Sequence, residues 1–199
     1  MTRTVDYFYS HVSPWTFLGH RRLIDIAARH GATIAFRPIT VAEIFPKTGG
    51  LPLAKRPPER RAYRMVELKR WSKHLGVAIN FEPKFFPADD RPALYLAHAA
   101  RAAGVDLADL SYAILKGVWQ DERNIADWDE LKTIADGLGL DGAALVDQAQ
   151  TEEIQAAAMA ECEAALAAGC FGVPWYSLDG EGFWGQDRLD LLEATLAGR

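Results

Sequence analysis

A short apolar strand that leads directly into a capped helix constrains this fold more than any other feature. Residues 5–9 (Val-Asp-Tyr-Phe-Tyr) read as a buried strand, and a brief turn separates them from Ser13 and Pro14. Serine is a preferred N-cap residue, and proline is favoured at the first helical position, where an N–H would have no partner. The helix start combines free backbone N–H groups, the positive end of the helix dipole and a hydroxyl donor. The sequence therefore predicts a small anion-binding site at Ser13.

The same position carries a Cys-x-x-Cys pair in redox proteins of the thioredoxin type, whereas residues 13–16 of this chain are Ser-Pro-Trp-Thr. A thiol at a helix N-terminus has a pKa well below ~8.5. The pattern therefore indicates a site that stabilises a thiolate supplied from outside the chain. The alternative is that Ser13 only caps the helix, because no G-x-S-x-G elbow marks it as a nucleophile. His11, in the preceding turn, is either a base or an exposed turn histidine.

The next elements predict a strand–helix–strand unit. Apolar residues at near-helical spacing predict a helix over residues 14–30, and residues 33–39 read as a second strand. A unit of this length implies a right-handed crossover and a parallel strand pair. The Gly- and Pro-rich stretch at residues 45–52 predicts a loop and a domain boundary. Helical patterns then cover residues 59–75, 93–103, 107–121, 127–138, 142–150 and 151–168.

The last part of the chain returns to strand character. Residues 171–178 predict a strand, Asp-Gly-Glu-Gly at 179–182 a turn, and residues 183–185 the returning strand of a hairpin. A closing helix follows from residue 186 to residue 196. This order is that of an α/β, thioredoxin-like fold with an inserted all-helical domain. Residues 1–45 and 169–199 would form the thioredoxin-like domain, and residues 46–168 the helical insertion.

Size and charge limit the function classes. A chain of 199 residues can form one sizeable core with a substantial insertion. Its net charge of −5 argues against nucleic acid as the main partner, and no stretch approaches the ~18–20 apolar residues of a membrane span. The first residues lack a secretory signal pattern, so we expect a cytoplasmic protein. Cys162 and Cys170 match neither a redox pair nor a zinc site and are predicted to be buried, reduced thiols.

Three further motifs carry candidate binding chemistry. Pro174 is anomalous in an apolar strand, and its position alone favours an ordinary trans proline at a sheet edge. A cis bond would instead turn the N–H and C=O of Val173 outward, toward an extended peptide-like ligand. Asp187 is either a simple N-cap or the partner of a ligand ammonium, as in a site for an α-amino acid head group. Lys47 is either a solvated charge or a cation that binds a substrate carboxylate.

Together these motifs resemble the 2-hydroxychromene-2-carboxylate isomerases. That family belongs with the kappa-class glutathione transferases in the DsbA-like branch of the thioredoxin superfamily. The resemblance runs over essentially the whole chain, including the helical insertion. The motifs occur in the family's order and spacing: Ser13-Pro14-Trp15, Lys47 with Gly49-Gly50, Phe171-Gly172-Val173-Pro174 and Trp184-Gly185-Gln186-Asp187-Arg188-Leu189.

The resemblance implies a role for each motif, with glutathione as the cofactor. It implies that Ser13 hydrogen-bonds the glutathione sulfur and that Val173, before a cis Pro174, pairs with the glutathione backbone. The segment around Asp187 would hold the γ-glutamyl end, and Gly50 stands where an Asn is often found. The residues assigned in this way are Trp184, Gly185, Gln186 and Asp187 for glutathione, and Lys47, Gly50 and Phe86 for the substrate.

The activity that the resemblance implies is glutathione-dependent isomerisation of a small aromatic pyruvate. Reversible thiolate addition turns a double bond into a single bond, rotation follows, and elimination returns the thiol, so glutathione is not consumed. The resemblance also implies a homodimer. A kappa-like glutathione transferase would release a conjugate instead, and a non-catalytic thioredoxin-like binding module would do neither. A disulfide oxidoreductase is disfavoured because no cysteine occupies position 13 or 16.

Overall fold

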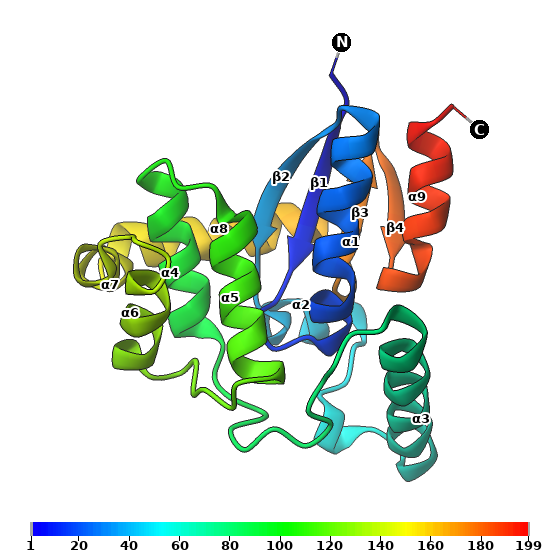
Figure 1. The fold of residues 1–199 in the computed structure, drawn as a ribbon, viewed down its shortest axis with the longest axis horizontal. Coiled ribbons are helices and arrows are strands. Elements are labelled where there is room, and N and C mark those ends of the chain that lie inside the picture. Colours follow the sequence, from blue (N-terminus) through cyan, green and yellow to red (C-terminus); the bar gives the residue numbers. More distant parts are fainter. Residues whose placement is uncertain (1, 199) are drawn as a thin grey trace.

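A four-stranded mixed sheet forms the centre of the computed structural model, which describes residues 2–198 (Figure 1). The strand order is β2-β1-β3-β4, with β1 and β2 parallel and the other neighbouring pairs antiparallel. Strands from the two ends of the chain therefore pair in the middle of the sheet, which confirms the predicted α/β class. The strand bounds are Thr4–Tyr9 for β1, Thr33–Pro38 for β2, Trp175–Leu178 for β3 and Glu181–Trp184 for β4.

Helices cover both faces of the sheet because β1 alternates its side chains between them. Tyr7 and Tyr9 pack in one cluster with apolar residues of α1 and α9, whereas Phe8 packs on the opposite face with residues of α2 and α8. Each face thus has its own buried cluster. The helices concerned are α1 (Pro14–His30), α2 (Val41–Thr48), α8 (Glu152–Ala167) and α9 (Leu189–Leu196).

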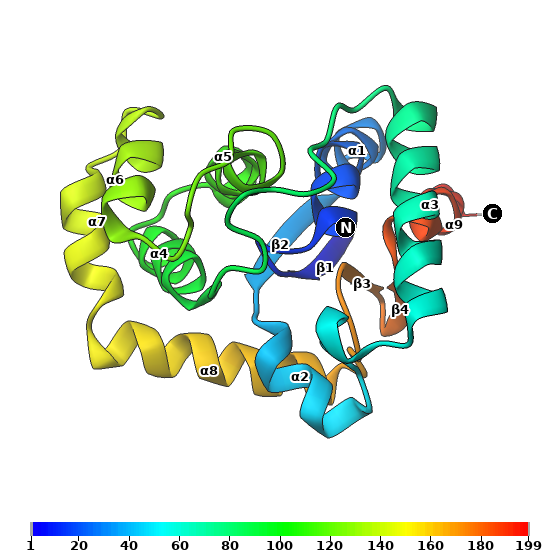
Figure 2. The ribbon, with the colours of Figure 1, turned by 90° about the horizontal axis from the view of Figure 1, so that it is seen from below.

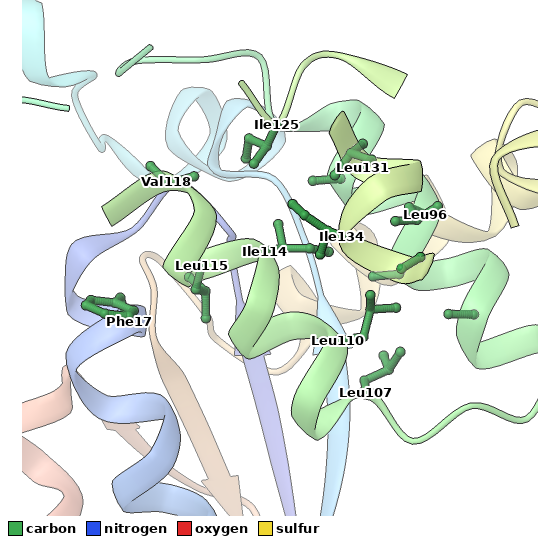
Figure 3. Packing of buried hydrophobic residues seen from close by; sticks show 14 of the residues in the cluster. Phe17, Leu96, Leu107, Leu110, Ile114, Leu115, Val118, Ile125, Leu131 and Ile134 are labelled. Carbon is green, nitrogen blue, oxygen red and sulfur yellow. The ribbon is translucent and has the colours of Figure 1, made fainter. Parts of the chain in front are cut away.

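The helices α4 to α7 form a layer beside β2, and their core is continuous with α1 (Figure 1). Figure 3 shows Phe17 of α1 in the same cluster as Leu110 and Ile114 of α5 and Ile134 of α6. Within residues 2–198, no helix combines the length and apolar character needed to cross a bilayer. The remaining bounds are η1 Leu53–Lys55, α3 Pro58–Leu75, α4 Arg91–Ala102, α5 Leu107–Trp119, α6 Trp128–Asp136, α7 Gly142–Ala149 and η2 Gln186–Arg188.

Several predicted element bounds were wrong, and the strand predicted at residues 171–178 begins only at Trp175. The stretch predicted as a loop at residues 45–52 contains the second half of α2. Thr40 caps that helix by accepting a hydrogen bond from the N–H of Ala42, and Ile44 anchors it as a fully buried side chain. Gly49 then ends the helix in the left-handed conformation (φ 78°). The hairpin turn is also shorter than predicted, because β3 and β4 pair up to Leu178 and Glu181.

The strand register brings the candidate motifs to one end of the sheet, which we call the lower end. Phe8 near the end of β1 lies opposite Trp175 at the start of β3, and Trp175 lies opposite Trp184 at the end of β4. In the parallel pair, Tyr9 lies opposite the last residue of β2. The start of α1, the start of α2, the loop before β3 and the segment after β4 therefore share this end, which Figure 2 views from below.

Candidate active site

Ser13 begins α1 as the sequence predicts. The residue is 8% exposed, and its backbone is extended (φ −89°, ψ 120°), as an N-cap requires. Its Oγ accepts a hydrogen bond from the N–H of Thr16 at 3.2 Å, and its C=O accepts one from Phe17 at 3.0 Å. Across residues 2–198, Ser13 Oγ takes part only as an acceptor, so its O–H proton remains available to a ligand.

The first turn of α1 keeps one further donor. Pro14 has no N–H, and the N–H of Thr16 is used by Ser13. No hydrogen bond in the part of the chain that the structure describes uses the N–H of Trp15. A serine hydroxyl and a backbone N–H therefore meet at the positive end of a helix of 17 residues. This arrangement stabilises a small anion.

His11 does not serve Ser13 as a base. It is 1% exposed, so the expectation of an exposed turn histidine was wrong. Its Nε2 lies 3.4 Å from Ser111 Oγ on α5, and its ring packs edge-on against Tyr9. Burial lowers the pKa of His11 to about 3, which keeps the imidazole neutral.

The Val173–Pro174 bond is cis, as the resemblance implies and contrary to what position alone favours. Pro174 precedes β3 instead of standing in an edge strand, so it removes no hydrogen bond from the sheet. Its C=O accepts the N–H of Gly185 at 2.9 Å, which ties this loop to the end of β4. Among residues 2–198, no hydrogen bond uses the N–H or C=O of Val173. A donor and an acceptor are therefore free for an extended ligand.

The segment after β4 is fixed by its neighbours. Gly185 has a φ of 101°, and a Cβ there would lie 2.5 Å from Oδ1 of Asp187, so glycine is required. Gln186 is buried, and its Oε1 and C=O both accept from Nη1 of Arg22, at 2.7 and 3.1 Å. The carboxylate of Asp187 is exposed and pairs with Arg188 at 2.9 Å. Asp187 is thus the residue of this segment that is free to meet a ligand.

Two exposed aromatic side chains border this segment. Trp184 is 52% exposed, and its ring contacts that of Phe171 edge-on, with centroids 4.7 Å apart. The close packing of Trp184 leaves no room for a side chain at Gly172, where a Cβ would lie 2.9 Å from the indole nitrogen. The motifs around Val173 and Trp184, although distant in sequence, thus form one surface.

The residues predicted to meet the substrate lie in different surroundings. Lys47, in the last turn of α2, forms an ion pair with Glu163 of α8. Gly50 faces the ring of Phe45, which would lie 2.2 Å from a Cβ at that position. An aromatic ring thus takes the space of the Asn that the resemblance leads one to expect. Phe86 is half-buried and packs on Trp119, with a centroid distance of 5.0 Å.

Sequence reasoning missed a buried carboxyl at the lower end. Asp90, which precedes α4, is 7% exposed and accepts hydrogen bonds from Ser10 Oγ at 2.6 Å and Thr40 Oγ1 at 2.7 Å. Its partners are distant in sequence, so no local pattern connects them. The only available signal was an Asp two residues before Pro92 at a helix start, which reads as an ordinary cap.

The two cysteines take no part in this site. Cys162 and Cys170 are free and buried in the cluster on the α2–α8 face of the sheet, as predicted. Burial raises the pKa of each thiol to about 11. Both are therefore protonated at neutral pH and unreactive.

The fold and the site define a class: a thioredoxin-fold protein with a cis-proline loop but a serine in place of a redox cysteine pair. The chain belongs to the DSBA-like thioredoxin domain family, which matches residues 4–197, and within it to the 2-hydroxychromene-2-carboxylate isomerase family. The resemblance found in the sequence is therefore confirmed.

The relatives agree over the full length of the chain. It is 32% identical to the 2-hydroxychromene-2-carboxylate isomerase of Sphingobium xenophagum, over 98% of this chain and 99% of the relative. It is 24% identical to human glutathione S-transferase kappa 1, over 98% of this chain and 92% of the relative. Its fold is similar to a solved 2-hydroxychromene-2-carboxylate isomerase structure, with a TM-score of 0.80, 24% identity and coverage of 98% and 95%.

Proposed function

We propose that this protein is a glutathione-dependent isomerase of the 2-hydroxychromene-2-carboxylate type. The observation that carries the proposal is that two kinds of hydrogen-bonding group, unpaired within residues 2–198, lie at the same end of the sheet. Ser13 and the N–H of Trp15 offer donors to an anion, and Val173 offers an unpaired backbone. The isomerase names of the relatives support the reaction, and the kappa transferase relative supports the cofactor.

The residues of the lower end fit glutathione group by group. A thiolate needs hydrogen-bond donors, which the O–H of Ser13 and the N–H of Trp15 supply. It also needs a site without a competing cysteine, and position 13 is a serine. A peptide backbone needs an unpaired donor and acceptor, which Val173 supplies. An α-ammonium needs an exposed carboxylate, and Asp187 can exchange its pairing with Arg188 for it. All of these groups lie on elements that the sheet register places together.

When bound, glutathione supplies a sulfur nucleophile that adds reversibly to a conjugated double bond, so that the bond can rotate. Ser13 donates its O–H toward the sulfur, and the start of α1 lowers the energy of negative charge there. His11 is neutral and bonded elsewhere, so it contributes no proton to this position. The chain's role is therefore to keep a borrowed thiol ionised and correctly placed.

Lys47, Gly50 and Phe86 are proposed to form the substrate side. Lys47 would bind the substrate carboxylate by exchanging its exposed ion pair with Glu163, because such a pair contributes little stability. The Phe45 ring that lies over Gly50 would replace a polar contact with an apolar one. The substrate class is thus a small aromatic carboxylate. From the resemblance, the enzyme would work as a cytoplasmic homodimer.

Titration with reduced glutathione tests the proposal. Ligand at ~100 times its dissociation constant adds ~2.7 kcal/mol to the stability, so the melting temperature should rise. A thiolate absorbance band should appear with glutathione but not with S-methylglutathione, which lacks the thiol and is the matched control. Absence of both signals would contradict the proposal and leave a binding module of another kind.

Product analysis separates the isomerase from a kappa-like transferase. With a 2-hydroxychromene-2-carboxylate substrate, an isomerase leaves the total free glutathione constant while the substrate spectrum changes. A transferase consumes one glutathione for each product molecule. A stoichiometric conjugate would therefore replace the proposed reaction while retaining the proposed thiol site.

A further inference from the structure

One buried carboxyl joins three segments that build the lower end of the sheet. Asp90 stands immediately before α4, and its own C=O accepts the N–H of Leu94 in the first turn of that helix. Its Oδ2 accepts from Ser10 in the turn after β1, and its Oδ1 accepts from Thr40 at the start of α2. Both contacts are short (2.6 and 2.7 Å), as expected for hydroxyl donors to a carboxylate.

The carboxyl of Asp90 also orients the hydroxyl groups of Ser10 and Thr40, because each donates its proton to it. Because the hydroxyl of Ser10 donates its proton to Asp90, its Oγ can accept the N–H of Val12 at 3.4 Å. The backbone C=O of Ser10 also accepts the N–H of Ser13, at 3.1 Å. Thr40 likewise donates to Asp90 and accepts the N–H of Ala42 as the cap of α2. The turn that carries Ser13 is therefore fixed at its first residue by Asp90.

No cation neutralises this carboxyl within residues 2–198. The adjacent Arg91 pairs with Asp89 at 2.7 Å, and both of these side chains are exposed. Burial raises the pKa of Asp90, while the hydroxyl hydrogen bonds from Ser10 and Thr40 lower it. A buried carboxyl without an ion pair costs stability unless its hydrogen bonds are complete. Burial of Asp90 below the Ser13 turn thus costs folding stability, which points to a functional role for this carboxyl.

We propose that Asp90 is a positioning residue for the reaction: through Ser10 it sets the place and direction of Ser13 Oγ at the start of α1. The inference rests on the proposed function, since it concerns the thiolate that this site would stabilise. Asp90 itself acts through Ser10, at the base of the turn, and Thr40 ties α2, which carries Lys47, to the same point.

The sign of one measurement separates positioning from simple electrostatics. A negative charge near a thiolate raises the thiol pKa, so if Asp90 acted only through its charge, Asp90→Asn would lower that pKa or leave it unchanged. Loss of positioning has the opposite effect, because Ser13 and the helix start no longer face the sulfur. We expect Asp90→Asn to raise the pKa of the bound glutathione thiol by about one pH unit and to reduce kcat by on the order of 10- to 100-fold, with KM changed less.

A reporter that needs no glutathione keeps this inference separate from the proposed function. Ser13→Cys places a thiol at the start of α1, and its pKa can be measured by its rate of alkylation against pH. Adding Asp90→Asn to this variant should raise that thiol pKa. An unchanged or lowered value would overturn the inference even if glutathione binds. If glutathione does not bind the wild type but the reporter pKa rises, the proposed function fails and the positioning role stands.

Two variants complete the test. Ser10→Ala removes the link through which Asp90 acts, so its effect on the reporter pKa and that of Asp90→Asn should be strongly non-additive. Additive effects would indicate general loosening of the fold and would overturn the inference. Asp89→Asn is the matched control, since within residues 2–198 the carboxyl of Asp89 accepts hydrogen bonds from Arg91 and from no residue of the turn. It should leave the reporter pKa unchanged.

Discussion

At the scale of the residue, Ser13 combines two duties that mutation can separate. Ser13→Ala removes both the cap to Thr16 and the hydroxyl donor, and should destabilise the fold by about 1 kcal/mol. Ser13→Gly also removes the hydroxyl but costs only a few tenths of a kcal/mol as a cap. Both should weaken transition-state stabilisation by ~2–4 kcal/mol and raise the pKa of the bound thiol. Steady-state kinetics and thiolate absorbance would show this, and wild-type kcat in Ser13→Gly would contradict it.

Asp187 offers a second residue-scale prediction, on binding instead of chemistry. Its carboxylate is exposed and, within residues 2–198, paired only with the adjacent Arg188. Asp187→Ala should weaken glutathione binding by about tenfold, the order expected for one charge-assisted hydrogen bond, with a smaller change in kcat. Calorimetric titration measures the affinity. Asp179→Asn, which changes a carboxylate at the opposite end of the β3–β4 hairpin, serves as control and should bind glutathione normally.

At the scale of the element, a glycine determines how closely α1 approaches the segment after β4. A Cβ at Gly19 would lie 2.8 Å from the Cβ of Gln186 and 2.9 Å from the hydroxyl of Tyr176. Gly19→Ala should therefore displace η2, destabilise the protein by about 1–3 kcal/mol and weaken glutathione binding. Denaturant unfolding and calorimetry test this. Gly117→Ala, on α5, meets nothing closer than 3.4 Å and should be neutral or stabilising.

Local signals predicted the elements they control, and contacts distant in sequence account for what was missed. The bounds of α1 were predicted because its start and end are marked in the sequence by Ser13-Pro14 and Gly31. α2 was missed because Pro46 and Gly49 read as loop residues, whereas Thr40 and Ile44 stabilise a helix there. The division into domains at residues 45/46 and 168/169 stays a prediction. The buried cluster does not mark this division, because it joins residues of α1 to residues of α5.

The candidate site follows the same rule. The four motifs could be predicted to belong together only through the family resemblance, and the sheet register brings those around Ser13, Val173 and Trp184 to one end. Asp90 could not be predicted, because its partners lie 80 and 50 residues away. The roles of Ser13, Val173 and Asp187 toward glutathione stay predictions that the experiments above address.

At the scale of the whole molecule, buried histidines should make the fold sensitive to acid. His11 is buried against Tyr9, and His20 is buried against Tyr7 and Tyr9. Burial lowers the pKa values of His11 and His20 to about 3 and about 4. Unfolded histidine has a pKa of ~6.5, so below this pH the unfolded state binds protons that the folded state does not. Stability should therefore be complete above pH ~6.5 and fall with decreasing pH, by up to about 1.4 kcal/mol per pH unit for each histidine.

The pH dependence of unfolding tests this arrangement, and Asp90 acts in the opposite direction to the two histidines. The raised pKa of Asp90 lets the folded state bind a proton first, which partly offsets the loss on acidification above pH ~3.8. Urea unfolding at pH 7, 6 and 5 measures the slope. His20→Gln removes one titrating group along with its contacts to Tyr7 and Ala108, so the protein should be less stable at pH 7 but lose stability more slowly on acidification. An unchanged slope in His20→Gln would mean that this imidazole is already protonated in the folded state, and the neutral histidine core argued from burial would be wrong.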